Sequence, residues 1–281
     1  MHFKQITIIG TGLIGGSLAM AVKQHKLVGK IIGCDREPVL KKTVNLRAID
    51  VGEPSPEKAV AGSDVVVLAT PVGAIIELME RLGPLLPPST LLTDVGSTKL
   101  EIVRRAKMVF GGAADTRFLA GHPIAGKEHG GIEQAEATLF DGAVWIFTSS
   151  ASSQAGPKKA FTRLVEGIGA KVMFMDPERH DRLCAWISHL PQLLSTAVAG
   201  SLIEEFGDAA ELNRIGGRAL RELTRTASSP YYVWRDIAHT NATNIEEALL
   251  KLEQRLAHIR ENLKTPELRA EFERANRFRK D

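Results

Sequence analysis

The first part of the chain alternates between short apolar runs and longer segments in which apolar residues recur every three or four positions. Short, β-branched runs are typical of strands that are buried on both faces. We expect such strands at 6–9, 30–34, 64–69, 91–94, 117–120, 143–147 and 171–174. The segments between them, such as 13–24 and 74–82, predict helices. Strands that alternate with helices indicate a mostly parallel sheet with right-handed crossovers.

The pattern changes after about residue 175, where no convincing strand follows. Residues 180–206 predict one long helix, interrupted or kinked at Pro191, because proline cannot donate to the helix ladder. Farther on, apolar residues are spaced four and three apart at Ile245, Leu249, Leu252, Leu256, Ile259 and Leu263. This heptad-like spacing predicts a helix that packs on its own domain or against another subunit. We therefore expect an α/β domain at 1–175 and an all-α domain at 176–281.

Composition narrows the class of protein. With 281 residues, 44% hydrophobic and 25% charged, the chain resembles an ordinary globular protein with a sizeable core. The net charge of +3 is too small to indicate nucleic acid or a membrane surface as a partner. No apolar run approaches the roughly 18–20 residues of a membrane helix, and no secretory leader is expected. Cys34 and Cys184 form no disulfide framework, which favours small buried thiols and a cytoplasmic location.

Three glycines follow the first predicted strand in the pattern Gly10-x-Gly12-x-x-Gly15 and open the first predicted helix. In dinucleotide-binding folds the first permits a tight turn and the second lets the backbone approach the pyrophosphate. The third allows close packing of helix on strand, and the helix N-terminus supplies N–H groups for phosphate. This context predicts a Rossmann-type domain that binds a dinucleotide, with Leu13 and Ile14 as further contacts.

The choice between the two nicotinamide cofactors depends on Asp35 and Arg36. Asp35 lies 20 residues beyond Gly15, where such folds carry an acid that binds the adenosine ribose hydroxyls. Arg36 could instead meet a 2′-phosphate, which would favour NADP. We expect NAD because a carboxylate repels that phosphate, and NADP is the alternative.

Polar residues follow successive predicted strands at the edge of the sheet where ligands bind. Thr70 and Pro71 follow one strand and are expected to contact the cofactor, whereas Ser97 and His122 follow the next two and are expected to face the nicotinamide. Histidine suits proton exchange near neutral pH, and hydride removal from a carbinol needs a base for the hydroxyl proton. His122 is therefore the candidate base of a dehydrogenase, with a structural histidine as the alternative.

The helical half offers weaker candidates. His189, Arg225 and the segment Trp234-Arg235-Asp236 each fit a structural or solvated role when taken alone, although an arginine could clamp a carboxylate through two hydrogen bonds. The other histidines show no metal-ligand spacing, such as a pair at i and i+4 with an acid. We predict no metal site.

Taken together, these motifs resemble the prephenate/arogenate dehydrogenases of tyrosine biosynthesis over nearly the whole chain. The motifs are Gly10-x-Gly12-x-x-Gly15, Asp94-Val95-Gly96-Ser97-x-Lys99, Gly121-His122-Pro123-Ile124-Ala125-Gly126, Ser188-His189-Leu190-Pro191, Thr224-Arg225-x-Ala227-Ser228 and Trp234-Arg235-Asp236. The resemblance implies a Rossmann-type N-terminal domain, a helical C-terminal domain that makes a homodimer, and a small-molecule site between them.

The resemblance also implies an oxidative decarboxylation of prephenate or arogenate, which yields 4-hydroxyphenylpyruvate or tyrosine. A hydride leaves the ring carbon that bears the hydroxyl for NAD(P), and the ring carboxylate departs as carbon dioxide. In the implied roles, His122 takes the hydroxyl proton and Ser97 orients both His122 and the nicotinamide. Arg225 binds a substrate carboxylate, and His189 contacts the substrate.

One departure from the family pattern bears on the substrate. Lys127 stands where the family usually has a small hydroxyl residue. If it faces the substrate side chain, a lysine favours the pyruvyl group of prephenate over the ammonium of arogenate.

The sequence leaves three alternative functions open. An NADP-dependent enzyme specific for arogenate would carry the same motifs. A β-hydroxyacid-type dehydrogenase shares the domain plan but typically uses a lysine base on the helical half, against which the His122 and Arg225 motifs argue. A non-enzymatic NAD-binding regulator would keep the glycine loop without a base in the crevice.

Overall fold

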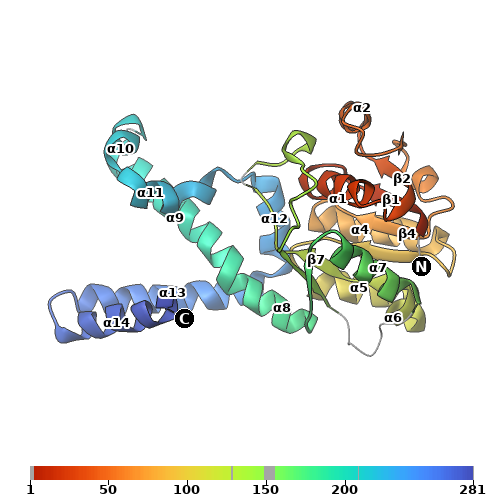
Figure 1. Cartoon of the computed structure of the whole chain (residues 1–281). Helices are drawn as coiled ribbons and strands as arrows, with labels where there is room; N and C mark the ends of the chain where they lie inside the picture. Colours follow the sequence, from red (N-terminus) through yellow and green to blue (C-terminus); the bar gives the residue numbers. More distant parts are fainter. Residues whose placement is uncertain (1–2, 128, 149–155, 208, 281) are drawn as a thin grey trace.

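The computed structural model describes residues 3–127, 129–148, 156–207 and 209–280. The N-terminal half forms a layered α/β body, and the C-terminal helices extend away from it as two arms (Figure 1). One arm contains α9 to α11 and the other contains the antiparallel pair α13 and α14. The helix α12 lies between the arms and the α/β body.

Six parallel strands form the main sheet in the order β3-β2-β1-β4-β5-β6. Their bounds are β1 Phe3–Ile9, β2 Val28–Cys34, β3 Val51–Gly52, β4 Val65–Leu68, β5 Leu91–Asp94 and β6 Phe118–Leu119. The order reverses between β1 and β4, which is the switch point where doubly wound folds bind their ligands. Ile9 pairs with Leu68, and Leu68 pairs with Asp94, so the loops after these strands leave the same edge of the sheet. This part of the predicted fold class is confirmed.

Helices cover both faces of this sheet. Their bounds are α1 Leu13–Gln24, α2 Glu37–Asn45, α3 Pro56–Ala59, α4 Val72–Leu82, α5 Leu100–Phe110, α6 Ala114–Arg117 and α7 Gly156–Gly167, with single turns at Gly83–Leu85, Gly111–Ala113 and Ile132–Gln134. Val65 and Val67 of β4 pack into one buried cluster with residues of α1 and α7, whereas Val66 and Leu68 pack into another with residues of α4 and α5. Burial on both faces explains the continuous apolar runs in the sequence.

A second sheet corrects the prediction of one mostly parallel sheet. It consists of β7 Gly121–Pro123, β8 Val144–Phe147 and β9 Lys171–Phe174, with β7 antiparallel to β8 and β8 parallel to β9. The chain therefore leaves the main sheet after β6, and His122 lies on a short edge strand opposite Ile146. An edge position tolerates Pro123, which has no N–H to donate.

The helical half begins with α8 Pro177–Cys184, and its elements differ in one respect from the prediction. They continue as η5 Ala185–His189, α9 Leu190–Phe206, α10 Ala209–Ile215, α11 Gly217–Thr224, η6 Arg225–Ser228, α12 Tyr231–Thr240, α13 Ala242–Glu261 and α14 Pro266–Lys280. The predicted long helix over 180–206 is interrupted by the π-helical turn η5 and not at Pro191. Pro191 lies in the first turn of α9, where a missing N–H costs little.

Two carboxylates of the helical half cap helices of the nucleotide half. The N–H of Gly73, at the start of α4, donates to Asp236 at 2.9 Å. The N–H groups of Lys99 and Leu100, at the start of α5, donate to Asp181 at 2.7 and 2.9 Å. Neither helix has a side-chain cap at its own N-terminal residue in the described structure. These capping bonds satisfy otherwise unpaired helix donors and fix how the two halves meet.

The predicted seam of apolar residues over 245–263, which runs along α13 and just past its end, is only partly covered. Ile245 is buried, but Leu256 and Leu263 are 51% and 59% exposed. No helix within the described ranges is both long and apolar enough to cross a lipid bilayer.

Candidate active site

A cavity of about 1080 Å³ lies between the two halves. The nucleotide half lines it with the loops that follow β1, β2, β4 and β5 and with the segment 122–127. The helical half contributes residues around Ser188 and between Ser229 and Ile237. The volume is at the upper end of the range for ligand pockets, and sites between domains are a common location for them.

The glycine loop has the shape that a pyrophosphate requires. Gly10 has φ +92°, and a Cβ there would lie 2.4 Å from the carbonyl oxygen of Ala69. A Cβ on Gly15 would lie 1.9 Å from the oxygen of Gly10, so this glycine allows α1 to pack closely on the loop. A Cβ on Gly12 would meet nothing within 4 Å, because this residue borders the cavity. The residues present therefore fit a dinucleotide.

Most of the predicted cofactor residues lie together on one wall of the cavity. They are Gly10, Gly12, Leu13, Ile14, Asp35, Arg36, Thr70 and Pro71. Asp35 is held in place there, because its carboxylate accepts from the N–H of Thr11 at 2.8 Å and from that of Arg36 at 2.8 Å. Gly15 lies behind this wall as a packing residue. Their contacts with the cofactor itself stay predictions.

His122 lines the same cavity and is partly buried on β7. Desolvation lowers the pKa of its imidazole well below 6.5, and the neighbouring His180, Lys99 and His189 lower it further. The ring is therefore neutral at neutral pH, which is the protonation state of a general base.

A buried ion pair fixes the backbone around this histidine. Lys99 and Asp94 pair at 0% exposure, and the ammonium of Lys99 also donates to the carbonyl of Gly121 at 2.7 Å. The Asp94 carboxylate accepts from the N–H groups of Gly96 at 2.8 Å and Gly121 at 3.2 Å. Burial raises the pKa of Asp94 and lowers that of Lys99, and their mutual attraction opposes both changes. The pair ties the loop that carries Ser97 to the strand that carries His122.

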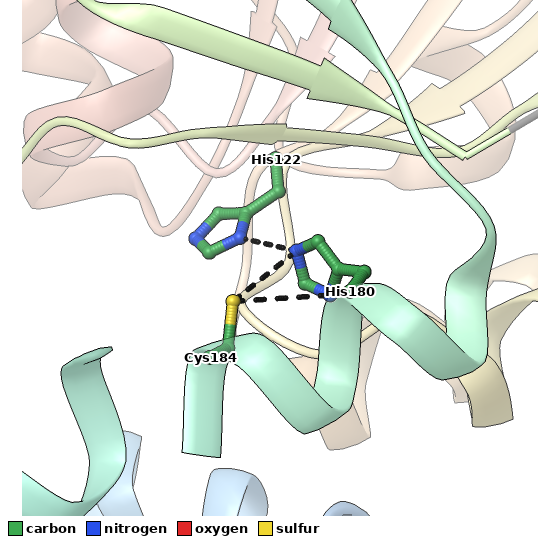
Figure 2. Close-up of side chains that lie close together, drawn as sticks. All are labelled: His122, His180 and Cys184. Carbon is green, nitrogen blue, oxygen red and sulfur yellow. Dashed lines mark hydrogen bonds between the residues drawn. The ribbon is translucent and has the colours of Figure 1, made fainter. Parts of the chain in front are cut away.

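The ring hydrogen bond that the structure shows for His122 does not run to Ser97. Its Nδ1 lies 2.8 Å from Nε2 of His180, at an edge-to-face angle (Figure 2). His180 in turn lies 2.8 Å from Asp181 through Nδ1. Ser97 and His122 both line the cavity, and the role of Ser97 in orienting the base stays a prediction. His180 and Asp181 are site residues that the sequence reasoning missed.

His189 lies just behind the cavity wall. It is 1% exposed, its Nδ1 lies 3.2 Å from the amide nitrogen of Asn241, and its ring meets Trp234 edge-on. Desolvation lowers its pKa to about 4. Among the described residues, Nε2 of His189 has no hydrogen-bond partner. Its neighbours Ser188 and Trp234 line the cavity, so a contact of His189 with substrate stays a prediction.

The two predicted cations occupy different positions. Lys127 lines the cavity, and its ammonium contacts the carbonyl of Gln134 at 2.9 Å and the carboxylate of Glu136 at 3.2 Å. Arg225 is exposed at the start of η6, and its side chain is not part of the cavity wall. The wall begins four residues later, at Ser229.

One cluster has the residue types of a metal site. Ligand atoms of His122, His180 and Cys184 lie within 4.8 Å of one another. Two imidazole nitrogens on one zinc ion stand about 3.3 Å apart, given Zn–N bonds of about 2.0 Å in tetrahedral geometry. The two nitrogens here are 2.8 Å apart, which is a hydrogen-bond distance. We therefore describe the cluster as hydrogen bonded and assign no metal to it.

A sequence signal for part of this cluster exists. His180 and Cys184 are four residues apart and therefore lie on one face of a helix. Asp181 follows directly, and a buried carboxylate next to a histidine is a common way to orient its ring. Nothing in the sequence indicates that this face would meet His122.

Two family models match the chain in succession. One, described as the nucleotide-binding domain of prephenate dehydrogenase, matches residues 18–174, and another, described as its dimerization domain, matches residues 176–275. A prephenate dehydrogenase of Bacillus subtilis is 33% identical over 246 residues, which are 85% of this chain and 65% of that protein.

Solved structures agree with these matches. A crystal structure of Aquifex aeolicus prephenate dehydrogenase, in complex with hydroxyphenyl propionate and NAD+, is 31% identical with a TM-score of 0.85 and covers 100% of this chain and 96% of that chain. A Synechocystis arogenate dehydrogenase is 26% identical with a TM-score of 0.79 and covers 98% of this chain and 99% of that chain.

Proposed function

The chain belongs to the prephenate dehydrogenase family of NAD-dependent oxidoreductases, and we propose that its cavity carries out the oxidative decarboxylation of prephenate. One observation carries the proposal: a neutral histidine, His122, lines the same cavity as a glycine loop shaped for a dinucleotide. A base and a hydride acceptor in one cavity are what the reaction needs.

His122 acts as the general base. The glycine loop would hold NAD, which would supply the acceptor for the hydride of the ring carbon that bears the hydroxyl. His122 takes the hydroxyl proton as the carbonyl forms. The ring carboxylate then leaves as carbon dioxide, the electron pair of the broken bond makes the ring aromatic, and the ring oxygen takes a proton back to become the phenol. Because desolvation holds the imidazole neutral, it is ready to accept this proton at neutral pH. Ser97, on the loop after β5, lines the same cavity and is the residue proposed to orient His122 and the nicotinamide.

Asp35 supports NAD as the cofactor over NADP. Its carboxylate is fixed at the cavity wall by the N–H of Thr11 and would repel a 2′-phosphate at the adenosine ribose. Arg36, beside it, also lines the wall and is the residue through which NADP could still bind.

Lys127 supports prephenate over arogenate. Lys127 lines the cavity after β7, and a positive charge there favours the pyruvyl carboxylate of prephenate over the ammonium of arogenate. Its contact with Glu136 offsets part of that charge, so the preference is modest. Arg225 and His189 are the proposed substrate contacts from the helical half, on the basis of the family resemblance.

The helical half matches a dimerization domain, and we propose that the protein is a homodimer. The exposed apolar residues Leu256 of α13 and Leu263, just beyond its end, support this, because a second copy would cover them. The free, buried thiols of Cys34 and Cys184 support a reducing compartment, for which we propose the cytoplasm.

The experiment is a four-way assay of absorbance at 340 nm, with prephenate or arogenate, each with NAD or NADP. We expect turnover to be fastest with prephenate and NAD. A clear preference for arogenate would contradict the role of Lys127, and at least tenfold better efficiency with NADP would contradict the role of Asp35. Folded protein that binds NAD but turns over none of the four pairs would overturn the proposed function.

A further inference from the structure

Three side chains form a chain of hydrogen bonds that starts at the base and ends at a carboxylate. His122 Nδ1 lies 2.8 Å from His180 Nε2, and His180 Nδ1 lies 2.8 Å from Asp181. His180 and Asp181 are 0% and 1% exposed, so no water competes for these bonds. Figure 2 shows the other ring nitrogen of His122 pointing away from His180 and Cys184.

The carboxylate fixes the direction of every bond in this chain. Asp181 already accepts the N–H groups of Lys99 and Leu100, one on each oxygen, so both oxygens act as hydrogen-bond acceptors in this position. His180 must then donate from Nδ1, and a neutral imidazole that carries its proton on Nδ1 can only accept at Nε2. His122 must therefore donate from its own Nδ1, which leaves its Nε2 unprotonated.

The position of Cys184 independently indicates that Nε2 of His180 is a hydrogen-bond acceptor. The sulfur of Cys184 lies 3.5 Å from His180 Nε2. Burial raises the pKa of this thiol to about 12, so the group stays an S–H donor. Two donors, the thiol and His122 Nδ1–H, thus surround His180 Nε2, which agrees with an acceptor at that atom.

We infer that His180 and Asp181 are positioning residues that hold His122 in the tautomer with its proton on Nδ1, so that Nε2 is the lone pair that takes the substrate proton. The inference rests on the proposed function for the identity of the base. It also gives the helical half a part in the chemistry, because α8 carries His180 and Asp181 whereas β7 carries His122.

The alternative arrangement has His180 doubly protonated. Its Nε2 would then donate to His122 Nδ1, and His122 would carry its own proton on Nε2, where it could not act as a base. The ammonium of Lys99 lies near this cluster and disfavours a second buried positive charge. The two arrangements place the proton of His122 on opposite ring nitrogens, so one measurement separates them.

The measurement is a long-range proton–nitrogen NMR spectrum of the full-length protein with NAD, labelled with ¹⁵N-histidine, at pH 7.5. The pattern of couplings reports which ring nitrogen of each histidine carries a proton, and the His122→Asn variant assigns the His122 signals. We expect a protonated Nδ1 and an unprotonated Nε2 for His122. A protonated Nε2 on His122, or a doubly protonated His180, would overturn the inference.

Two substitutions separate tautomer control from a structural role. His180→Phe keeps a ring in the site but accepts no hydrogen bond, so we expect the Nδ1–H signal of His122 to be lost and kcat to fall about tenfold, with the KM for NAD changed less than about threefold. In His180→Gln, Asp181 attracts the amide N–H₂ group, so the amide oxygen faces His122. We expect this variant to restore the Nδ1–H signal and part of kcat.

The matched control is His25→Phe, because His25 is exposed at the end of α1 and far from the site in the sequence. It should change neither the His122 signals nor kcat. If His180→Phe folds and leaves His122 in its wild-type tautomer, the inference is wrong. If that variant fails to fold, the wild-type spectrum and His180→Gln still decide. The spectra need no turnover, so a failure of the proposed function would be seen separately.

Discussion

The nucleotide half and the helical half differ in how far each is stabilised by its own interior. In the nucleotide half, two clusters of buried apolar residues lie on the two faces of the main sheet, and large side chains such as Trp145 and Phe147 are completely buried. In the helical half, many of the buried residues are polar, as in His180, Asp181 and Gln192. Its far ends expose apolar side chains, namely Ile203, Phe206, Ile215, Leu256, Leu263 and Phe272.

This difference shows how the work of the protein is divided. The nucleotide half can hold its loops, and hence the cofactor site, by its own core. The helical half depends on other surfaces, because its carboxylates Asp181 and Asp236 are satisfied by helix N-termini of the nucleotide half. Its outer apolar residues are exposed in the single chain, and the proposed homodimer would cover them. The following predictions test this division.

Removing the base should have the largest effect. In His122→Asn the amide can still donate to His180, so the geometry is kept while the base is lost. We expect kcat to fall by roughly 10²–10⁴, the usual scale of general acid–base catalysis, with NAD binding unchanged. Steady-state kinetics with His25→Asn as the control would check this. Activity within threefold of wild type would rule out His122 as the base.

Removing a large core side chain should destabilise the nucleotide half strongly. Phe147 is completely buried and has ring contacts with Phe161 and Phe174 at centroid distances of 6.2 and 6.0 Å. We expect Phe147→Ala to lower the free energy of unfolding by about 3–5 kcal/mol. Phe272→Ala, at an exposed position of α14, should lower it by less than about 0.5 kcal/mol at low protein concentration. Similar losses in urea denaturation would remove the contrast between the halves.

The buried histidine behind the cavity should make stability depend on pH. The pKa of His189 is about 4 in the folded state and 6.5 for the free side chain, so the unfolded state binds the proton first. The contribution of the neutral His189 ring to the free energy of unfolding is complete above about pH 6.5 and is lost as the pH falls toward 4. The expected loss is about 3 kcal/mol between pH 7 and 4. In urea denaturation, the free energy of unfolding of His189→Gln should fall by about 3 kcal/mol less than that of the wild type between pH 7 and 4. The same pH dependence in both proteins would contradict the burial of a neutral ring.

Arg225 tests whether the helical half supplies a cation to the substrate. A charged hydrogen bond to a carboxylate contributes about 1.5–3 kcal/mol, so Arg225→Ala should raise the KM for prephenate roughly 10- to 100-fold and change kcat less. Arg218→Ala is the control, because Arg218 is 88% exposed on α11 and pairs with Glu222. An unchanged KM would end the proposed role of Arg225.

The smallest expected effect concerns assembly. Leu256 lies on the exposed part of the α13 seam, so Leu256→Asp should raise the dissociation constant of the dimer at least about tenfold. Sedimentation at micromolar concentration would measure it. Met108→Asp is the matched control, since Met108 is equally apolar and 76% exposed on α5 of the nucleotide half. A wild-type protein that is monomeric at this concentration would contradict the proposed homodimer.

The sequence predicted most elements of the main sheet well. It predicted poorly which residues meet across the cavity between the two halves. The apolar runs of β1, β4 and β5 and the glycine loop between β1 and α1 follow from local pattern, since burial on both faces and tight turns restrict the residue types. The two-residue strand β3 was too short to give a pattern. The second sheet escaped prediction because periodicity identifies a strand but not its partner.

By itself, the sequence determined the doubly wound half, the glycine loop, Asp35 and His122 as the candidate base. Each of these depends on a few neighbouring residues and on the rule that parallel strands end at one edge. Only the tertiary structure decided that His180 meets His122 across 58 residues and that Asp236 caps α4 across 163 residues. Such contacts depend on how two folded halves pack together, and no local pattern of apolar and polar positions encodes that packing.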